Sequence, residues 1–218
     1  MKNICFLVSG GGGTLKFIDK ALKKFQLPYK ISGVISDRKC GAVDYCINSN
    51  ISYHILYNWK VEESYLNAIL NTQSPDIVIT TIHKKLSNDT LQSTQANFIN
   101  LHYSLLPSYG GVIGFKTLEL AKSNNAKIIG VTTHHVTENL DGGDIIAQAA
   151  MPVDWTEDWE KIGDKIFRIA CLTILNTLIY TDKLTVANIF DNPSDVIFSP
   201  KLCFDINCFS ETFWDSLK

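Results

Sequence analysis

Residues 100–114 read NLHYSLLPSYGGVIG, and residues 140–144 read LDGGD. Asn100 and His102 are two residues apart at the end of an apolar run, so on a strand both side chains lie on one face. The Leu-Leu-Pro-Ser-Tyr-Gly-Gly segment that follows cannot continue a strand, because Pro107 lacks an amide donor and the glycines favour a turn. Ligands of open α/β sheets bind beyond the carboxyl ends of the strands. We therefore expect Asn100 and His102 to face a ligand.

Predicted strands and helices alternate on both sides of this stretch. Short apolar runs predict strands and amphipathic segments between them predict helices, with strands at 4–8, 31–36, 51–56, 77–82 and 98–102. Such alternation is typical of a mainly parallel sheet. Residues 127–136 and 145–153 predict an antiparallel, hairpin-like pair joined by the LDGG turn, with a long helix over 160–178 and short strands and turns beyond Tyr180. The predicted fold is α/β, a single Rossmann-like domain with a mainly parallel central sheet.

A glycine-rich loop joins the first strand to the first helix. Its sequence favours an anion site, because the backbone can approach a ligand closely and the helix start presents unpaired amides. The pattern is neither GxGxxG nor a Walker loop, so phosphate binding and a plain tight turn weigh equally at this point. The residues concerned are Gly10, Gly11, Gly12, Gly13 and Thr14.

Composition excludes several classes of protein. The chain has 218 residues, 45% of them hydrophobic, and a formal charge of −2, which describes one ordinary globular domain without the basic excess of a nucleic-acid-binding protein. No apolar run reaches the roughly 20 residues that cross a bilayer. The six cysteines form no CxxC pair, which indicates free thiols in a reduced, cytoplasmic protein.

Two other kinds of chemistry are disfavoured by local spacing. His102, His134, His135 and Asp141 could be considered as zinc ligands, but none of their spacings is a known metal pattern, so we expect no metal. Ser104 lies outside a GxSxG context, so we do not expect a nucleophile elbow.

The motif NxHxSLLPxYxG, followed about forty residues later by LDGGxI, resembles the signature of the formyltransferases that use 10-formyltetrahydrofolate. The resemblance extends from the first strand to about Tyr180. It implies a catalytic trio of Asn, His and Asp, a second active-site histidine, a structural serine hydroxyl and a cis proline bond. These match Asn100, His102 and Asp141, then His134, Ser104 and Leu106–Pro107.

The resemblance also implies a folate co-substrate and a division of the chain. Residues 1–180 would form the catalytic domain, and 181–218 a short extension packed on it. The loop after the 77–82 strand and the LDGG turn would contact the pterin, although a solvated loop explains Lys84 and Lys85 equally well. The folate-binding residues implied are Lys84, Lys85, Leu86, Asn139, Leu140, Gly142 and Asp144.

The acceptor is expected to be a phosphate-bearing primary amine. Thr14 replaces the Asn of the family phosphate loop, TTIHKKLS replaces a GFMRIL-like stretch, and residues 167–170 lack the acidic residue that glycinamide ribonucleotide transformylase carries. The TIHKKLS segment resembles what the sugar N-formyltransferases of this family carry. This resemblance and the departures favour a nucleotide-linked amino sugar, of the dTDP-4-amino-4,6-dideoxyglucose type used in lipopolysaccharide O-antigen, over phosphoribosylglycinamide in purine biosynthesis.

Other functions and partners are ranked below these. Methionyl-tRNA is the weakest acceptor, and a non-catalytic folate- or nucleotide-binding module is the second alternative. We expect small-molecule partners only, the folate and the phosphorylated amine, with no nucleic acid and no membrane. A homodimer is left open.

Overall fold

A computed structural model describes residues 1–184, 186 and 195–217. It forms two compact units. The first contains Met1–Asn100 and His135–Leu140, and the second contains Leu101–His134 and the described residues from Asp141 onward. Each unit has its own hydrophobic core, and the two are described in turn.

Parallel strands form the centre of the first unit, in the order β3-β2-β1-β4-β5. The innermost runs, such as CFLV in β1, are buried without a polar break, as expected of parallel strands covered on both faces. The strand β5 continues into the second unit at its last two residues. The strands are β1 (Lys2–Val8), β2 (Tyr29–Ser36), β3 (Tyr53–Ile55), β4 (Ile77–Thr81) and β5 (Asn97–His102).

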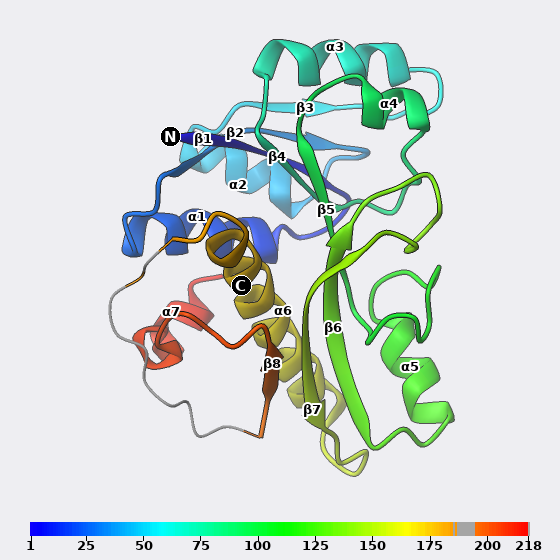
Figure 1. Cartoon of the computed structure of the whole chain (residues 1–218), viewed down its shortest axis with the longest axis vertical. Coiled ribbons are helices and arrows are strands. Elements are labelled where there is room, and N and C mark those ends of the chain that lie inside the picture. The colour runs from blue at the N-terminus through cyan, green and yellow to red at the C-terminus, as the bar shows by residue number, and fades with distance from the viewer. Residues whose placement is uncertain (185, 187–194, 218) are drawn as a thin grey trace. The chain divides into compact units, whose positions relative to one another are not determined.

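Helices cover both faces of these strands. Figure 1 shows α3 and α4 on one side of them and α1 and α2 on the other. Leu66, Ile69 and Leu70 of α3 are buried in one core cluster with residues of β1, β2 and β4. The helices are α1 (Gly13–Lys24), α2 (Gly41–Ser49), α3 (Glu63–Gln73) and α4 (Asn88–Gln92). The predicted α/β class and mainly parallel sheet are therefore confirmed.

An antiparallel set of strands forms the centre of the second unit. The strand β6 (Ile128–His135) pairs with β7 (Ile145–Pro152), which pairs with the short β8 (Ile197–Ser199). The helices α5 (Lys116–Ser123) and α6 (Trp159–Thr181) contribute apolar residues to the core of this unit. The β6–β7 pair confirms the antiparallel hairpin predicted around the LDGG turn.

The carboxyl-terminal segment differs from the expected strands and turns. A 3-10 turn, η1 (Ile206–Cys208), and a short helix, α7 (Glu211–Asp215), follow β8. The Ser210 hydroxyl accepts a hydrogen bond from the Phe213 amide at 3.3 Å, a helix-capping contact. Part of the predicted 181–218 extension, namely 185, 187–194 and 218, lies outside the described residues. The domain division at 180 stays a prediction.

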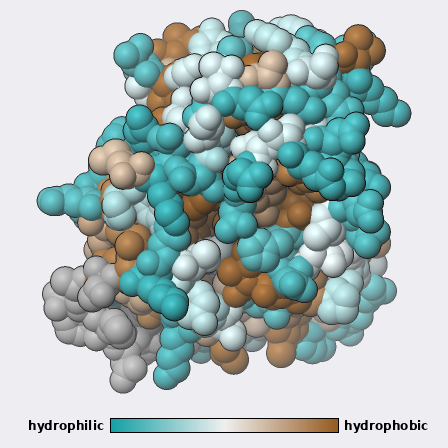
Figure 2. Space-filling view, turned by 45° about the horizontal axis from the view of Figure 1, so that its top comes forward, coloured by the Kyte–Doolittle hydropathy of each residue, from teal (hydrophilic) through white to brown (hydrophobic). Residues whose placement is uncertain are grey.

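The surface is mixed. On the face drawn in Figure 2, hydrophobic areas are interrupted by hydrophilic side chains. Among the described residues, no helix has both the length and the apolar character needed to cross a bilayer. All six cysteines are free thiols in the structure.

Candidate active site

Asn100 and His102 lie two residues apart on β5, as predicted. The Thr80 hydroxyl of the neighbouring strand β4 donates to Asn100 Oδ1 at 2.9 Å. With its oxygen accepting from Thr80, the amide presents its NH2 as a donor. His102 is buried, with its side chain 7% exposed.

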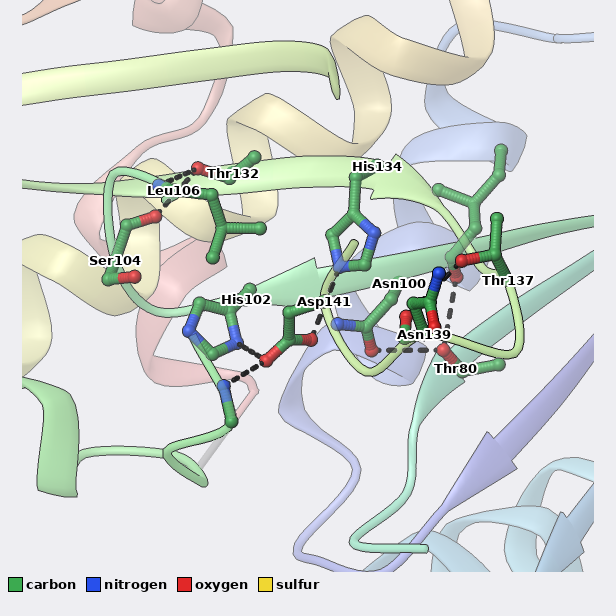
Figure 3. Close-up of polar contacts among 12 residues, drawn as sticks. Thr80, Asn100, His102, Ser104, Leu106, Thr132, His134, Thr137, Asn139 and Asp141 are labelled. Atoms are coloured by element: carbon green, nitrogen blue, oxygen red, sulfur yellow. Dashed lines mark hydrogen bonds and ion pairs between the residues drawn. The ribbon is translucent and has the colours of Figure 1, made fainter. Parts of the chain in front are cut away.

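Asp141 lies between two imidazoles in the second unit (Figure 3). Its Oδ2 atom is 3.4 Å from His102 Nδ1, and its Oδ1 atom is 3.4 Å from His134 Nε2. The Asp141 side chain is 8% exposed and that of His134 is 2% exposed. His134 therefore lies in the same cluster as His102 and Asp141, and its part in catalysis stays a prediction.

The loop after β5 supplies two backbone contacts to this cluster. The Tyr109 carbonyl lies 3.2 Å from His102 Nε2, and the Gly111 amide donates to Asp141 Oδ2 at 2.7 Å. Both Tyr109 and Asp141 have positive φ angles, of 57° and 51°. Positive φ is uncommon for residues other than glycine and is concentrated at functional sites. The site thus depends on an unusual backbone at two loops.

The predicted roles of Ser104 and Pro107 concern the same loop. The Ser104 hydroxyl donates to the Ser108 carbonyl at 2.5 Å, which spans the turn around the proline. The Leu106–Pro107 bond is cis, as the resemblance implied. The contact of Ser104 is consistent with a structural hydroxyl, and the role of this residue stays a prediction.

Burial and neighbouring charges shift the pKa values of His102 and Asp141 in opposite directions. Burial lowers the pKa of His102 below its ordinary value, and Asp141 and the Tyr109 carbonyl offset only part of this effect. Burial acts to raise the pKa of Asp141, but hydrogen bonds from His134 and the Gly111 amide, together with the imidazole charges, lower it overall. At neutral pH the cluster therefore holds an ionised carboxylate beside an uncharged His102.

This arrangement can move a proton. Both ring nitrogens of His102 face acceptors, namely Asp141 and the Tyr109 carbonyl. A neutral imidazole can donate to only one of them, whereas an imidazolium can donate to both. A proton that reaches His102 is therefore stabilised by groups already in place, and the shared carboxylate holds the ring in position.

The glycines of the glycine-rich loop, which lies in the first unit, differ in how much space a side chain would have. Gly10 and Gly11 have no atoms within 4 Å of where a side chain would begin, whereas a Cβ at Gly12 would lie 2.7 Å from Ala42 Cα. The N-terminal ends of α1 and α2 both lack a side-chain cap, and the Ala42 amide of α2 donates to the Gly10 carbonyl at 3.3 Å. Thr14 is buried at the start of α1. Phosphate binding by this loop stays a prediction.

A charged cluster beside this loop was missed by the sequence analysis. The buried carboxylate of Asp37 binds the Arg38 guanidinium through two contacts of 2.8 Å, and Lys84 Nζ lies 3.9 Å away. Burial acts to raise the pKa of Asp37, but the hydrogen bonds from Arg38 and Ser9 and the nearby cations lower it overall. An acidic residue directly after the second strand of a strand–glycine loop–helix unit is the signal that could have identified it.

The residues expected to bind folate are distributed over both units. Lys84, Lys85 and Leu86 follow β4 in the first unit, and only the side chain of Leu86 is buried there. Asn139 and Leu140 end the first unit, and the Thr137 hydroxyl donates to the Asn139 carbonyl at 3.2 Å. Gly142 and Asp144 are exposed in the second unit. Their folate contacts stay predictions.

The sequence analysis also missed the backbone groups of Tyr109 and Gly111. Only the glycine-rich end of the SLLPSYGG segment indicated a special backbone there. Within the described residues, no group of three or more His, Cys, Asp or Glu side chains is arranged to hold a metal ion.

Comparison with known proteins assigns this site to a family. The family model described as "Formyl transferase" matches residues 2–175. The chain belongs to the formyl transferase family.

Relatives and solved structures agree with this assignment. The chain is 29% identical over 158 residues to phosphoribosylglycinamide formyltransferase of Escherichia coli K12, covering 69% of this chain and 73% of the relative. It is 28% identical over 174 residues to the chloroplastic phosphoribosylglycinamide formyltransferase of Vigna unguiculata, covering 76% and 56%. The crystal structure of phosphoribosylglycinamide formyltransferase from Bacillus halodurans matches with a TM-score of 0.76 and 26% identity, covering 83% of this chain and 95% of that one.

The lengths of the relatives bear on how far the likeness extends. The matches cover between 32% and 60% of the length of four of the curated relatives. Family membership therefore applies to the matched region, and the activity of the whole protein is a matter for proposal.

Proposed function

We propose that this protein transfers a formyl group from 10-formyltetrahydrofolate to the primary amine of phosphoribosylglycinamide. The observation that carries the reaction class is the Asp141 carboxylate held between His102 and His134 at 3.4 Å on each side. Family membership supplies the donor, a co-substrate consumed in each turnover.

The reaction is an acyl transfer through a tetrahedral carbon. The acceptor nitrogen attacks the formyl carbon, the bond from that carbon to N10 of the folate breaks, and one proton of the amine ends on N10. Donors placed at the developing oxyanion lower the barrier. We assign this role to the NH2 group of Asn100, supported by the positive charge that the His102 ring on the same strand carries when it is protonated.

The proton path is assigned to the second-unit cluster. The ionised Asp141 takes a proton from the attacking amine, directly or through a water, and stabilises His102 when that ring is charged. The low exposure of the His102, His134 and Asp141 side chains keeps bulk water away and so limits hydrolysis of the formyl donor. No step of this scheme is assigned to a metal ion.

The relatives favour phosphoribosylglycinamide over the amino sugar that was expected from the sequence. The three proteins compared above are named for phosphoribosylglycinamide, and none of those three is named for an amino sugar. Arg168, in the segment where an acidic residue was sought, forms ion pairs with Asp164 and Glu211.

A nucleotide-linked amino sugar is the second candidate. Lys84 lies 3.9 Å from Asp37, and Asp37 contacts Ser9 at the start of the glycine-rich loop. These contacts place a cation beside the open loop, where a second phosphate of a diphosphate-linked sugar would be stabilised. A cytoplasmic location and a homodimer stay predictions.

The test is a comparison of acceptors at equal concentration. Purified protein is incubated with 10-formyltetrahydrofolate and phosphoribosylglycinamide, dTDP-linked or UDP-linked 4-amino sugars, or no acceptor, and the formylated product and free formate are both measured. We expect formylated phosphoribosylglycinamide as the main product, absent with the Asp141→Asn variant. A preference for an amino sugar would overturn the assignment of phosphoribosylglycinamide as the acceptor. Formate release without any formylated product would indicate a hydrolase, and no reaction with the donor would indicate a binding module.

A further inference from the structure

The Thr132 hydroxyl joins β6 to the loop that follows β5. It donates to the Ser104 carbonyl at 2.7 Å and accepts from the Leu106 amide at 3.0 Å (Figure 3). Thr132 is fully buried. The hydroxyl therefore satisfies two backbone groups of the loop that have no access to water.

Gln148 completes this network from the neighbouring strand. It lies opposite Thr132 in the antiparallel β6–β7 pair. Its Nε2 atom donates to the Leu106 carbonyl at 3.1 Å and to the Thr132 hydroxyl at 3.1 Å. The amide and the carbonyl of Leu106 are thus both held by side chains of the β6–β7 hairpin.

The anchored loop is the one that reaches the reacting groups. Three residues beyond Leu106, the Tyr109 carbonyl contacts His102, and the Gly111 amide contacts Asp141. The Leu105 carbonyl accepts from the Ser108 amide at 3.0 Å. This hydrogen bond closes the turn and links the anchored Leu106 to the residues that follow. Loosening the start of the loop would therefore displace both backbone contacts of the His102–Asp141 pair.

We propose that Thr132 and Gln148 are positioning residues that fix the loop so that Tyr109 and Gly111 orient His102 and Asp141. This inference rests on the proposed function for its kinetic effect, but the geometry that it concerns can be measured without any substrate. Neither side chain is assigned a contact with the folate or the acceptor.

The chain offers a matched control for Thr132. Thr133 is the next residue of β6, is equally buried and has the same side chain, but its hydroxyl bonds to Thr177 of α6 at 2.6 Å. Successive strand residues point to opposite faces. Substitution by Val removes a buried hydroxyl in either case, and only Thr132→Val releases the loop.

The experiment compares Thr132→Val, Thr132→Ser, Gln148→Leu and Thr133→Val in the full chain. We expect Thr132→Val and Gln148→Leu to lower kcat about 10- to 100-fold, with KM for both substrates unchanged. Thr132→Ser keeps the hydroxyl and should restore kcat. Thr133→Val should lose stability to the same extent as Thr132→Val and keep its kcat.

A substrate-free readout separates this inference from the proposed function. Hydrogen exchange at the Gly111 amide should become about tenfold faster in Thr132→Val and Gln148→Leu and stay unchanged in Thr133→Val. This result would support the inference even if the wild-type protein formylated none of the acceptors. Unchanged Gly111 exchange in the first two variants, or equal effects in all the Val and Leu variants, would overturn it. If Thr132→Val failed to fold, Gln148→Leu would decide.

Discussion

The Oδ1 atom of Asp141 lies 3.4 Å from Nε2 of His134. The other oxygen of the carboxylate faces His102 at the same distance. Because one carboxylate orients two imidazoles, loss of its charge should affect both rings. This relationship underlies the first two predictions and the predicted pH dependence of kcat/KM.

Asp141→Asn, His102→Ala and Asn100→Ala should each lower turnover. A decrease of about 100- to 1,000-fold is expected where a donor to the oxyanion is removed, and a decrease at least as large is expected for Asp141→Asn. Steady-state kinetics measures the effect, and circular dichroism serves as the control for folding. A folded variant with near wild-type turnover would show that the substituted residue has a different role.

His134→Ala and His135→Ala should differ strongly. The His134 side chain is 2% exposed and faces Asp141, whereas His135 is the next residue along β6 and is only half-buried. We expect the larger loss of kcat for His134→Ala. Equal losses in the two variants would contradict the assigned direction of the strand side chains.

Stability should fall when the solution is acidified from neutral pH. Burial lowers the pKa of His102 in the folded protein below the unfolded value of about 6.5. The folded state therefore favours the neutral ring, which stabilises the protein above the unfolded pKa, and this contribution is lost as the pH falls through the folded pKa. Urea unfolding at several pH values should show this loss, and a folded His102→Gln variant should show less of it.

The same titrations should appear in the kinetics. The lowered pKa of Asp141 keeps its carboxylate ionised throughout the neutral range, so kcat/KM should rise with pH as the acceptor amine and the His102 ring lose protons. A flat profile between mildly acidic and mildly alkaline pH would argue against this proton path.

Gly10→Ala and Gly12→Ala should separate binding from folding at the glycine-rich loop. Gly12 has a φ of 76° and no room for a Cβ, so its substitution should destabilise the protein by about 1–3 kcal/mol. Gly10 has room, so Gly10→Ala should fold normally and raise KM for the acceptor but not for the folate. Thermal unfolding and paired KM measurements test both expectations. Acceptor KM values that do not change in Gly10→Ala would show that phosphate binds elsewhere.

A chelator should leave activity unchanged, because the proposed scheme assigns every proton and charge to side chains and backbone groups. The assay is repeated after incubation with EDTA and after addition of zinc to the treated protein. Inhibition by EDTA that zinc reverses would instead support a metal site.

The sequence by itself determined the α/β class and the order of its elements. Continuous apolar runs such as residues 4–8 are typical of strands buried on both faces, and the LDGG turn between two further runs predicted the β6–β7 hairpin. The resemblance to the formyltransferase signature also implied roles for Asn100, His102, His134 and Asp141, and these catalytic roles stay predictions. The helix α7 was not predicted, since its five residues have too short a pattern to show a helical period.

Only the tertiary structure decided how the side chains and backbone groups meet. Asp141 is 39 residues from His102 in the sequence, and spacing alone does not show that one carboxylate contacts two imidazoles. Every residue type has a backbone carbonyl, and every type except proline has a backbone amide. Residue identity therefore carries no signal for the contacts of the Tyr109 carbonyl and the Gly111 amide. Thr132 and Gln148 come together through the register of an antiparallel pair, which a shift of one residue would abolish. The pKa directions of His102 and Asp141 likewise depend on burial and partners, which exist only once the chain has folded.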